Sequence, residues 1–195
     1  MTRPVNKEFD IRGINHLALV SSDMARTVEF YEGVLGMPLI KTIELPGGMG
    51  QHFFFALGNG DSLAFFWFPN APAAVPGVTN PAGLPGSEKS IVTANATMNH
   101  VAFNVPPELI DEYHDKLKAK GIKVTRVISH DDSLIGASLE ITPTTFVRSI
   151  YFFDPDGICL EFAAWTRELP RAGDVKHAPA HASDSARQRV PEAVK

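Results

Sequence analysis

The chain has 195 residues, of which 44% are hydrophobic and 21% are charged, a composition typical of a soluble globular protein and not of a disordered one. Its formal net charge of -4 comes without a clustered basic stretch, which excludes a nucleic-acid binder. A single cysteine excludes an intrachain disulfide, no apolar run approaches the roughly 20 residues of a membrane span, and residues 1–12 lack the apolar centre of a signal peptide, so we expect a cytoplasmic protein that contacts no membrane.

The first half of the chain predicts a strand, a helix and three short strands. Residues 14–20 alternate between apolar and polar side chains, and Ser21 and Ser22 then offer N-caps for a helix that ends at Gly36. The predicted helix covers 24–35, and the strands that follow it cover 38–45, 51–57 and 62–68.

The second half predicts the same order of elements. A strand over 101–105 precedes a helix over 107–120, and Gly121 ends that helix. The three strands that follow cover 122–129, 147–153 and 158–164. Each half is therefore a βαβββ unit, and the predicted fold class is α+β.

Composition divides the chain into five segments. Residues 1–12 form an N-terminal arm, 13–69 the first module, 70–97 a linker rich in proline and glycine, 98–168 the second module, and 169–195 a polar tail. We expect the tail to be extended, because it lacks hydrophobic periodicity.

Local sequence supports an internal repeat. Asn-His at 15–16 returns at 99–100, and the strand that contains Ala64 returns as the strand that contains Glu161. His100 follows His16 by 84 positions and Glu161 follows Ala64 by 97, so the second unit carries 13 extra residues. We place them in a loop over 131–145, where they disturb no strand pairing.

Turn signals predict the register of the last hairpin in each unit. An Asp-Pro-Asp-Gly sequence favours a three-residue loop with a bulge, which places Tyr151 opposite Glu161 on one sheet face. The corresponding loop of the first unit places Phe54 opposite Ala64, with His52 on the same face as Phe54.

Two histidines and one carboxylate form a candidate metal site. Glu161 lies in the middle of an apolar strand, where its charge is costly to bury without compensation. His16 and His100 occupy equivalent repeat positions and could supply that compensation by sharing a metal ion. This donor set is typical of nonheme iron(II), and manganese, cobalt and zinc also accept it. The alternative is that Glu161 points to solvent and that the histidines are packed or surface residues.

The paired units, the two Asn-His pairs and the run from Tyr151 to Glu161 resemble the vicinal oxygen chelate superfamily, which includes glyoxalases, bleomycin-resistance proteins and extradiol dioxygenases. The resemblance covers 13–165. It implies that the two modules form a curved mixed sheet around a metal ion, with His16, His100 and Glu161 as the ligands.

Within that superfamily the chain is similar to one-domain type I extradiol dioxygenases. The resemblance implies cleavage of a catechol, for example a biphenyl-2,3-diol, by dioxygen at iron(II), with Tyr151 beside the metal. Glyoxalase I needs a fourth ligand where this chain has Ala64, which favours the dioxygenase. The extradiol histidines expected near Asp61 and at 142–144 are absent, so His52 is the first candidate for the catalytic acid or base and His130 the second.

Two other functions stay open. One is a lyase, isomerase or epimerase related to glyoxalase that uses the metal as a Lewis acid, and the other is a drug-binding protein without catalysis. Phe54 and Phe66 share the predicted site face and suit a small aromatic substrate. We expect a homo-oligomer, most simply a dimer, and the modules could pair within one chain or between subunits.

Overall fold

The computed structural model describes residues 8, 13–75, 84 and 93–175, and the chain divides into two units. One unit is 6–167, and the other combines 1–5 with 168–195. The described part of the terminal unit, 168–175, contains a turn in which the Asp174 N–H donates to the Arg171 carbonyl over 3.1 Å. Most of the N-terminal arm, much of the linker and the tail beyond 175 lie outside the described residues.

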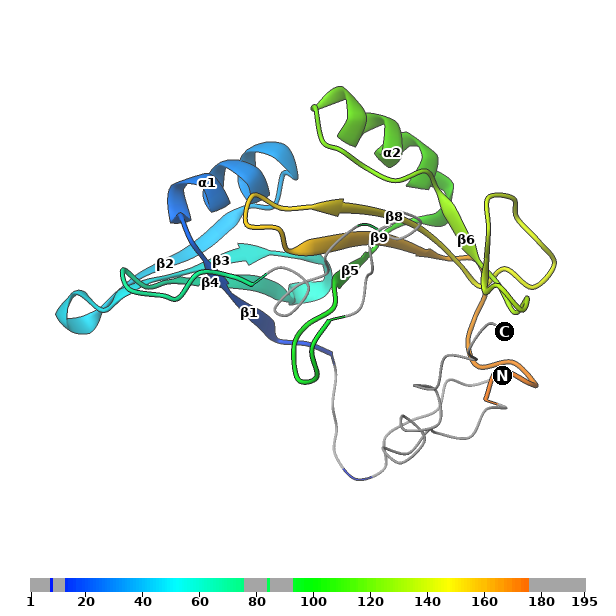
Figure 1. The fold of residues 1–195 in the computed structure, drawn as a ribbon, viewed down its shortest axis with the longest axis horizontal. Coiled ribbons are helices and arrows are strands. Elements are labelled where there is room, and N and C mark those ends of the chain that lie inside the picture. The colour runs from blue at the N-terminus through cyan, green and yellow to red at the C-terminus, as the bar shows by residue number, and fades with distance from the viewer. Residues whose placement is uncertain (1–7, 9–12, 76–83, 85–92, 176–195) are drawn as a thin grey trace, which may run out of the picture. The chain divides into compact units, whose positions relative to one another are not determined.

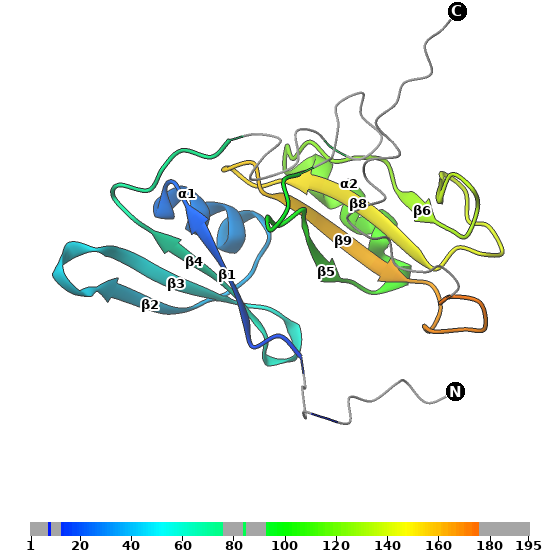
Figure 2. The ribbon, with the colours of Figure 1, turned by 60° about the horizontal axis from the view of Figure 1, so that its bottom comes forward.

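The first module forms a four-stranded sheet in the order β1-β4-β3-β2 (Figure 2). Its helix α1 continues into a π-helical turn before the chain returns to the sheet (Figure 1). The elements are β1 (His16–Ser21), α1 (Met24–Val28), the π-helical turn (Glu29–Val34), β2 (Leu39–Leu45), β3 (Gly50–Ala56) and β4 (Ser62–Trp67).

The second module forms a five-stranded sheet in the order β5-β9-β8-β6-β7. Its elements are β5 (Val101–Asn104), α2 (Ile110–Ala119), β6 (Ile128–His130), β7 (Ala137–Ser138), β8 (Val147–Phe153) and β9 (Cys159–Trp165). In each module the first strand runs parallel to the last and the other pairs are antiparallel, so both sheets are mixed. The α+β class is confirmed, with the strands distributed over two sheets.

The strand registers confirm the internal repeat. Ala18 of β1 pairs with Ala64 of β4, and Ala102 of β5 pairs with Glu161 of β9. Both hairpin predictions are also correct, because Ala64 faces Phe54 and Glu161 faces Tyr151. The turn before β9 has the predicted geometry, with Asp154 N–H donating to the Ile158 carbonyl over 3.0 Å and Gly157 at a φ of 84°.

Two local predictions were wrong. The strand expected over 122–129 is reduced to an isolated bridge at Val124 and the short β6, because the Thr125 side chain accepts the Tyr151 N–H that a continuous ladder would use. The helix α1 is capped by Asp23, whose side chain accepts from the Arg26 N–H. Ser21 and Ser22, the predicted caps, instead hydrogen-bond around this cap and to the second module.

The inserted residues also differ from the prediction of a plain loop. They contain β7, which pairs with β6 and extends the second sheet. Asp131 closes the insertion, because its buried carboxylate accepts from the Ser133 N–H and from the Thr142 hydroxyl. The extra residues therefore add a strand without shifting the β8–β9 register.

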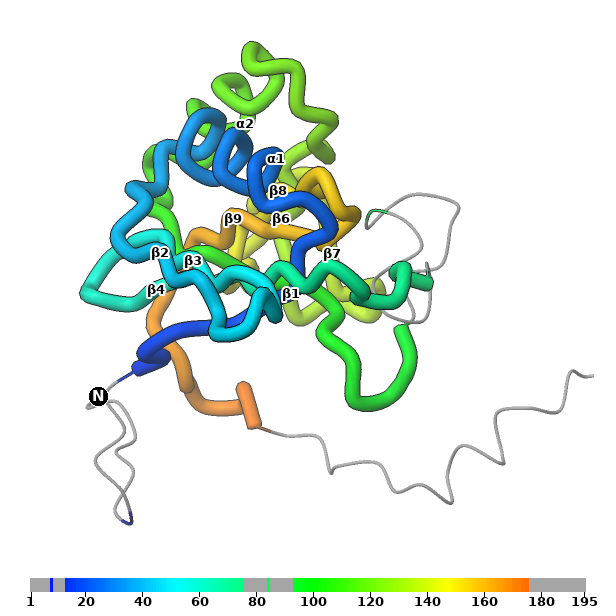
Figure 3. Tube along the Cα trace, turned by 90° about the vertical axis from the view of Figure 1, so that its left-hand side faces the viewer, coloured from blue at the N-terminus to red at the C-terminus, as the bar shows by residue number. Residues whose placement is uncertain are grey.

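Helices cover one face of the strands, as Figures 1 and 3 show for α1 and α2. Tyr31 is fully buried on this face of the first module, with its ring 4.8 Å from that of Phe65 and 5.7 Å from that of Phe55. Side chains alternate along a strand, so Phe54 and Ala64, the neighbours of Phe55 and Phe65, belong to the opposite face. In the described residues, neither α-helix is long and apolar enough to cross a membrane.

Candidate metal site

His100 and Glu161 form the centre of the site in the second module. The Nε2 atom of His100 lies 2.9 Å from Oε2 of Glu161, and Glu161 is only 5% exposed. Burial by itself would raise the pKa of the Glu161 carboxyl. The His100 imidazole, with smaller contributions from the Ser149 and Tyr151 hydroxyls, outweighs burial and lowers this pKa on balance. Glu161 is therefore an anion held inside the protein, and the outward-pointing alternative is wrong.

Tyr151 and His130 adjoin this pair. The Tyr151 hydroxyl lies 3.0 Å from Nε2 of His130, which is half-buried at the end of β6. Burial, and then the negative charge of Glu161, raise the pKa of Tyr151 well above its usual range, so the phenol stays protonated at neutral pH. Four side chains from β6, β8, β9 and the residue before β5 thus line one face of the second sheet.

The first module presents a histidine among aromatic rings. His16 is exposed at the start of β1, with its ring 5.5 Å from that of Phe54. His52 is 8% exposed and stacks flat on Phe66 at 3.6 Å between ring centroids. Its Nδ1 atom lies 3.1 Å from the Phe65 carbonyl oxygen, so Nδ1 is the donor and Nε2 is left for other contacts.

The structure brings two of the three predicted ligands together. Within the described residues, no three histidine, cysteine, aspartate or glutamate side chains gather closely enough to hold a metal ion. His16 therefore lies apart from the pair formed by His100 and Glu161. The ligand role of all three residues remains a prediction.

The donor chemistry of these residues fits a divalent metal. A buried carboxylate needs a compensating charge, and neutral imidazole nitrogens with a carboxylate oxygen are ligands that iron, manganese, cobalt and zinc share. Ala64 is fully buried at the position equivalent to Glu161, so the first module offers no matching carboxylate there.

Two contacts of the site histidines were not predicted from the sequence. Nδ1 of His16 lies 2.8 Å from Oδ1 of Asn15, and Nδ1 of His100 lies 2.8 Å from Oδ1 of Asn99. The repeat of the Asn-His dipeptide was the sequence signal from which these two contacts could have been predicted. The contact of His130 with Tyr151 was also missed, since His130 was only the second candidate for an acid or base.

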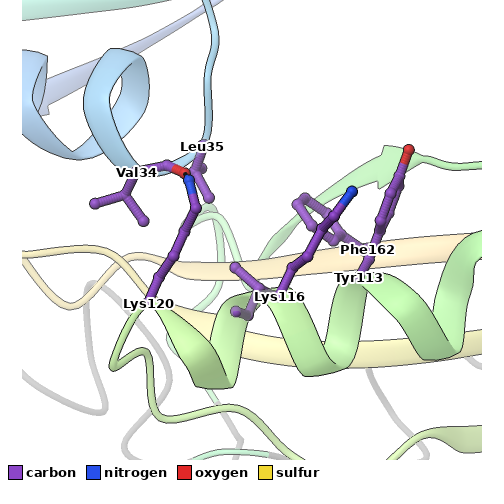
Figure 4. A pocket seen from close by; sticks show the side chains of 7 residues that line it. Val34, Leu35, Tyr113, Lys116, Lys120 and Phe162 are labelled. Atoms are coloured by element: carbon purple, nitrogen blue, oxygen red, sulfur yellow. Dashed lines mark hydrogen bonds between the residues drawn. The ribbon is translucent and has the colours of Figure 1, made fainter.

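A separate cleft of about 450 Å³ lies on the helix-covered side (Figure 4). Tyr113, Leu117 and Phe162 form its apolar wall. Its two ammonium groups already have partners, because Lys116 pairs with Glu112 and Lys120 donates to the Val34 carbonyl, as Figure 4 illustrates for Lys120. The cleft contains none of the predicted site residues.

Comparison with known proteins identifies the family. The model of the Glyoxalase/Bleomycin resistance protein/Dioxygenase superfamily matches residues 13–162. The chain belongs to this superfamily. The match spans both modules and therefore confirms the family that the Asn-His pairs and the Tyr151-to-Glu161 run resemble.

One curated protein and several solved structures are similar to this chain at low identity. The uncharacterised protein YwkD of Bacillus subtilis (strain 168) is 26% identical over 151 residues, covering 77% of this chain and 95% of YwkD. A glyoxalase/dioxygenase from Nostoc punctiforme has a TM-score of 0.55 at 21% identity, covering 86% of this chain and all of that one. The fosfomycin-resistance protein FosX from Listeria monocytogenes, in a complex with Mn(II) and sulfate, has a TM-score of 0.50 at 21% identity, covering 80% and 94%.

These comparisons establish the fold and the superfamily. FosX, which has a similar fold, is the protein among these whose structure contains Mn(II). Neither the choice of iron nor the cleavage of a catechol follows from them.

Proposed function

We propose that the protein is a metal-dependent extradiol-type dioxygenase that cleaves a catechol with dioxygen. The observation that carries this proposal is the buried pair of His100 and Glu161 with Tyr151 and His130 beside it. A carboxylate and an imidazole converge there, and the protonated phenol of Tyr151 lies beside them, with its ring 5.8 Å from that of His100.

His16, His100 and Glu161 would hold the ion, and iron(II) suits this ligand set for oxygen chemistry. Iron(II), when bound, would supply the redox chemistry that joins dioxygen to a catecholate, whereas zinc, which has no redox chemistry, would supply only charge. Three protein ligands leave positions open for two adjacent substrate oxygens. The buried Ala64, which cannot act as a fourth ligand, supports this count.

Tyr151 and His130 are suited to move a proton at the substrate. The phenol keeps its proton at neutral pH and can donate to a substrate oxygen. His130, with Nε2 3.0 Å from the phenol oxygen, can accept or return that proton through Tyr151. His130 thereby offers a substitute for the family histidine that is missing at 142–144.

The aromatic face of the first module suits a planar substrate. Phe54 stands beside His16, and Phe66 stacks on His52 with a nearly parallel ring, 6° between planes. A catechol ring could extend this stack, because offset ring pairs are favourable. His52, with Nδ1 bonded to the Phe65 carbonyl, would contact substrate through Nε2.

A second copy of the chain completes the site in this proposal. His16 lies in a different cluster from His100 and Glu161. His16 is on β1, the first strand of its module, whereas His100 directly precedes β5 and Glu161 is on β9, which pairs with β5. Both β1 and β5 are edge strands among the described elements, and Val20 of β1 is 50% exposed. A homodimer that places the β1 face of one subunit against the β5 face of its partner would gather the three ligands and cover exposed strand edges.

The second candidate is a lyase, isomerase or epimerase that uses the ion as a Lewis acid. The protonated Tyr151 and its contact with His130 favour it, since proton transfer at a carbon next to a polarised carbonyl requires such a pair. This chemistry needs no dioxygen, which separates the two candidates experimentally.

Oxygen uptake tests the proposal. Protein reconstituted anaerobically with iron(II) is mixed with catechols, including biphenyl-2,3-diol, and both oxygen consumption and the yellow ring-opened product are recorded. We expect both with wild type and neither with Glu161→Ala. Iron-loaded protein that consumes no oxygen with any catechol contradicts the dioxygenase, and exchange of a substrate C–H with deuterated solvent would support the Lewis-acid candidate. Protein that takes up no metal would be a binding protein.

A further inference from the structure

The two Asn-His pairs share one geometry as well as one sequence. In each module the asparagine Oδ1 atom and the histidine Nδ1 atom are 2.8 Å apart, a short hydrogen-bond distance. The asparagines are Asn15 and Asn99, and the histidines are His16 and His100. The contact recurs although the environments differ, because His100 faces a carboxylate and His16 faces a phenyl ring.

The amide oxygen determines which ring nitrogen carries the proton. A carbonyl oxygen only accepts, so Nδ1 is the donor in both pairs, and Nε2 of each ring is left for another partner. In the second module the side-chain NH₂ of Asn99 donates to the Thr93 hydroxyl over 3.3 Å, which turns Oδ1 toward His100. In the first module the backbone N–H of Ser62 donates to the backbone carbonyl of Asn15 over 3.0 Å, which holds the chain in place at the start of β1.

We propose that Asn15 and Asn99 are positioning residues that bind Nδ1 of both site histidines and so direct Nε2 of each ring toward the metal position. Nε2 of His100 lies 2.9 Å from Oε2 of Glu161, so the ring orientation that Asn99 holds directs Nε2 toward the predicted carboxylate ligand. Hydrogen bonds of this kind orient a ligand ring and raise its basicity, and their loss costs about 10–100-fold in metal affinity. The inference rests on the metal site of the proposed function.

The tautomer is measured directly in the metal-free, full-length protein. Long-range proton–nitrogen NMR spectra of protein labelled with ¹⁵N-histidine distinguish the protonated nitrogen from the free one, and the spectrum of His16→Gln identifies the signals of His16. We expect Nδ1 of His16 to be protonated in wild type and in Asn15→Asp, which keeps an acceptor oxygen. In Asn15→Ala the population should move toward the Nε2-protonated form.

Affinity for cobalt(II), measured by competition with a chelating dye, supplies the second readout. Asn15→Ala and Asn99→Ala should each weaken binding about 10–100-fold. The conservative variants Asn15→Asp and Asn99→Asp should retain most of it. Asn104→Ala is the matched control, since Asn104 is an exposed asparagine on β5. Thermal unfolding of every variant verifies that each one folds.

Three results would overturn the proposal: an Nε2-protonated His16 in wild type, a tautomer unchanged in Asn15→Ala, or aspartate variants that bind cobalt as poorly as the alanine variants. These readouts require no turnover. If the iron-loaded protein fails to consume oxygen while the tautomers and the cobalt affinities behave as expected, the dioxygenase fails and the role of the asparagines stands.

Discussion

The Tyr31 hydroxyl, in the first module, donates a hydrogen bond of 3.1 Å to the carboxylate of Asp154, in the second. Asp154 also accepts from the backbone N–H groups of Asp156 and Ile158 and so closes the turn before β9. Because Glu161 follows that turn on β9, one buried carboxylate links the first module to the strand that carries a predicted metal ligand.

This carboxylate makes stability depend on pH. Burial raises the pKa of Asp154 to about 6 from an ordinary value of 3.8, although the hydrogen bonds from Ile158 and Tyr31 oppose the shift. The folded state therefore holds the proton more tightly than the unfolded state, and the stabilisation present below the unfolded value is lost as the pH rises through about 6. The loss amounts to about 3 kcal/mol at about 1.4 kcal/mol per pKa unit.

Asp154→Asn tests this dependence, because the amide keeps an acceptor oxygen for the turn but does not ionise. Urea unfolding of both proteins at about pH 4.5 and pH 7.5 should show the wild type losing free energy of unfolding relative to the variant. Parallel pH profiles would contradict the role assigned to Asp154.

Tyr31→Phe should lower stability by about 1–3 kcal/mol by leaving the carboxylate with one donor fewer.

Removal of any predicted ligand should strongly weaken metal binding. His16→Ala, His100→Ala and Glu161→Ala should each weaken cobalt(II) affinity by more than about 100-fold, beyond the loss typical of a residue that only orients a ligand. His114→Ala is the control, since His114 lies on α2 and bonds to Asp115. Wild-type affinity in any of the three variants would remove that residue from the ligand set.

Mixed variants reveal whether subunits share the site. If His16 of one subunit joins His100 and Glu161 of its partner, a heterodimer of His16→Ala and Glu161→Ala contains one site with every ligand intact. We expect metal binding and activity to return when the two inactive variants are unfolded together and refolded. No recovery in verified heterodimers would place the three ligands within one chain.

His130 should affect catalysis through Tyr151. His130→Phe removes the nitrogen beside the phenol oxygen and should lower kcat about 100-fold, in line with the contribution of general acid–base catalysis, while leaving KM nearly unchanged. His130→Gln, which can still hydrogen-bond to Tyr151, should recover part of the rate. In a Tyr151→Phe background the two His130 variants should have equal rates; a further loss there would mean that His130 acts independently.

Gly50 begins β3, the strand that carries His52, in a backbone conformation that favours glycine. Gly50 has a φ of 141°, and a Cβ atom there would stand 2.0 Å from the Trp67 carbonyl oxygen. Gly50→Ala should therefore cost about 3 kcal/mol or more in the free energy of unfolding. Gly58→Ala, with nothing within 4 Å of the added methyl group, should leave stability unchanged or slightly higher. Similar stability losses in both would contradict this account of β3.

Much of the fold follows from local chemistry that the sequence states directly. The Asp-Pro-Asp-Gly turn has few alternative conformations, and strand alternation then carries its register outward, so the pairing of Tyr151 with Glu161 was predictable. The interruption near Thr125 was not, because it depends on a hydroxyl that competes for the N–H of a strand far along the chain.

Some features of the candidate site likewise follow from the sequence, and others depend on the tertiary structure. The repeat by itself determined that His16 and His100 are equivalent, that Ala64 replaces a carboxylate, and that Glu161 is the unusual residue of its strand, because each of these is a comparison of positions along the chain. Only the tertiary structure decided that Glu161 is buried against His100, that His130 meets the Tyr151 hydroxyl, and that His16 lies in another cluster. Burial and hydrogen bonding depend on distances between strands, and sequence spacing does not contain those distances.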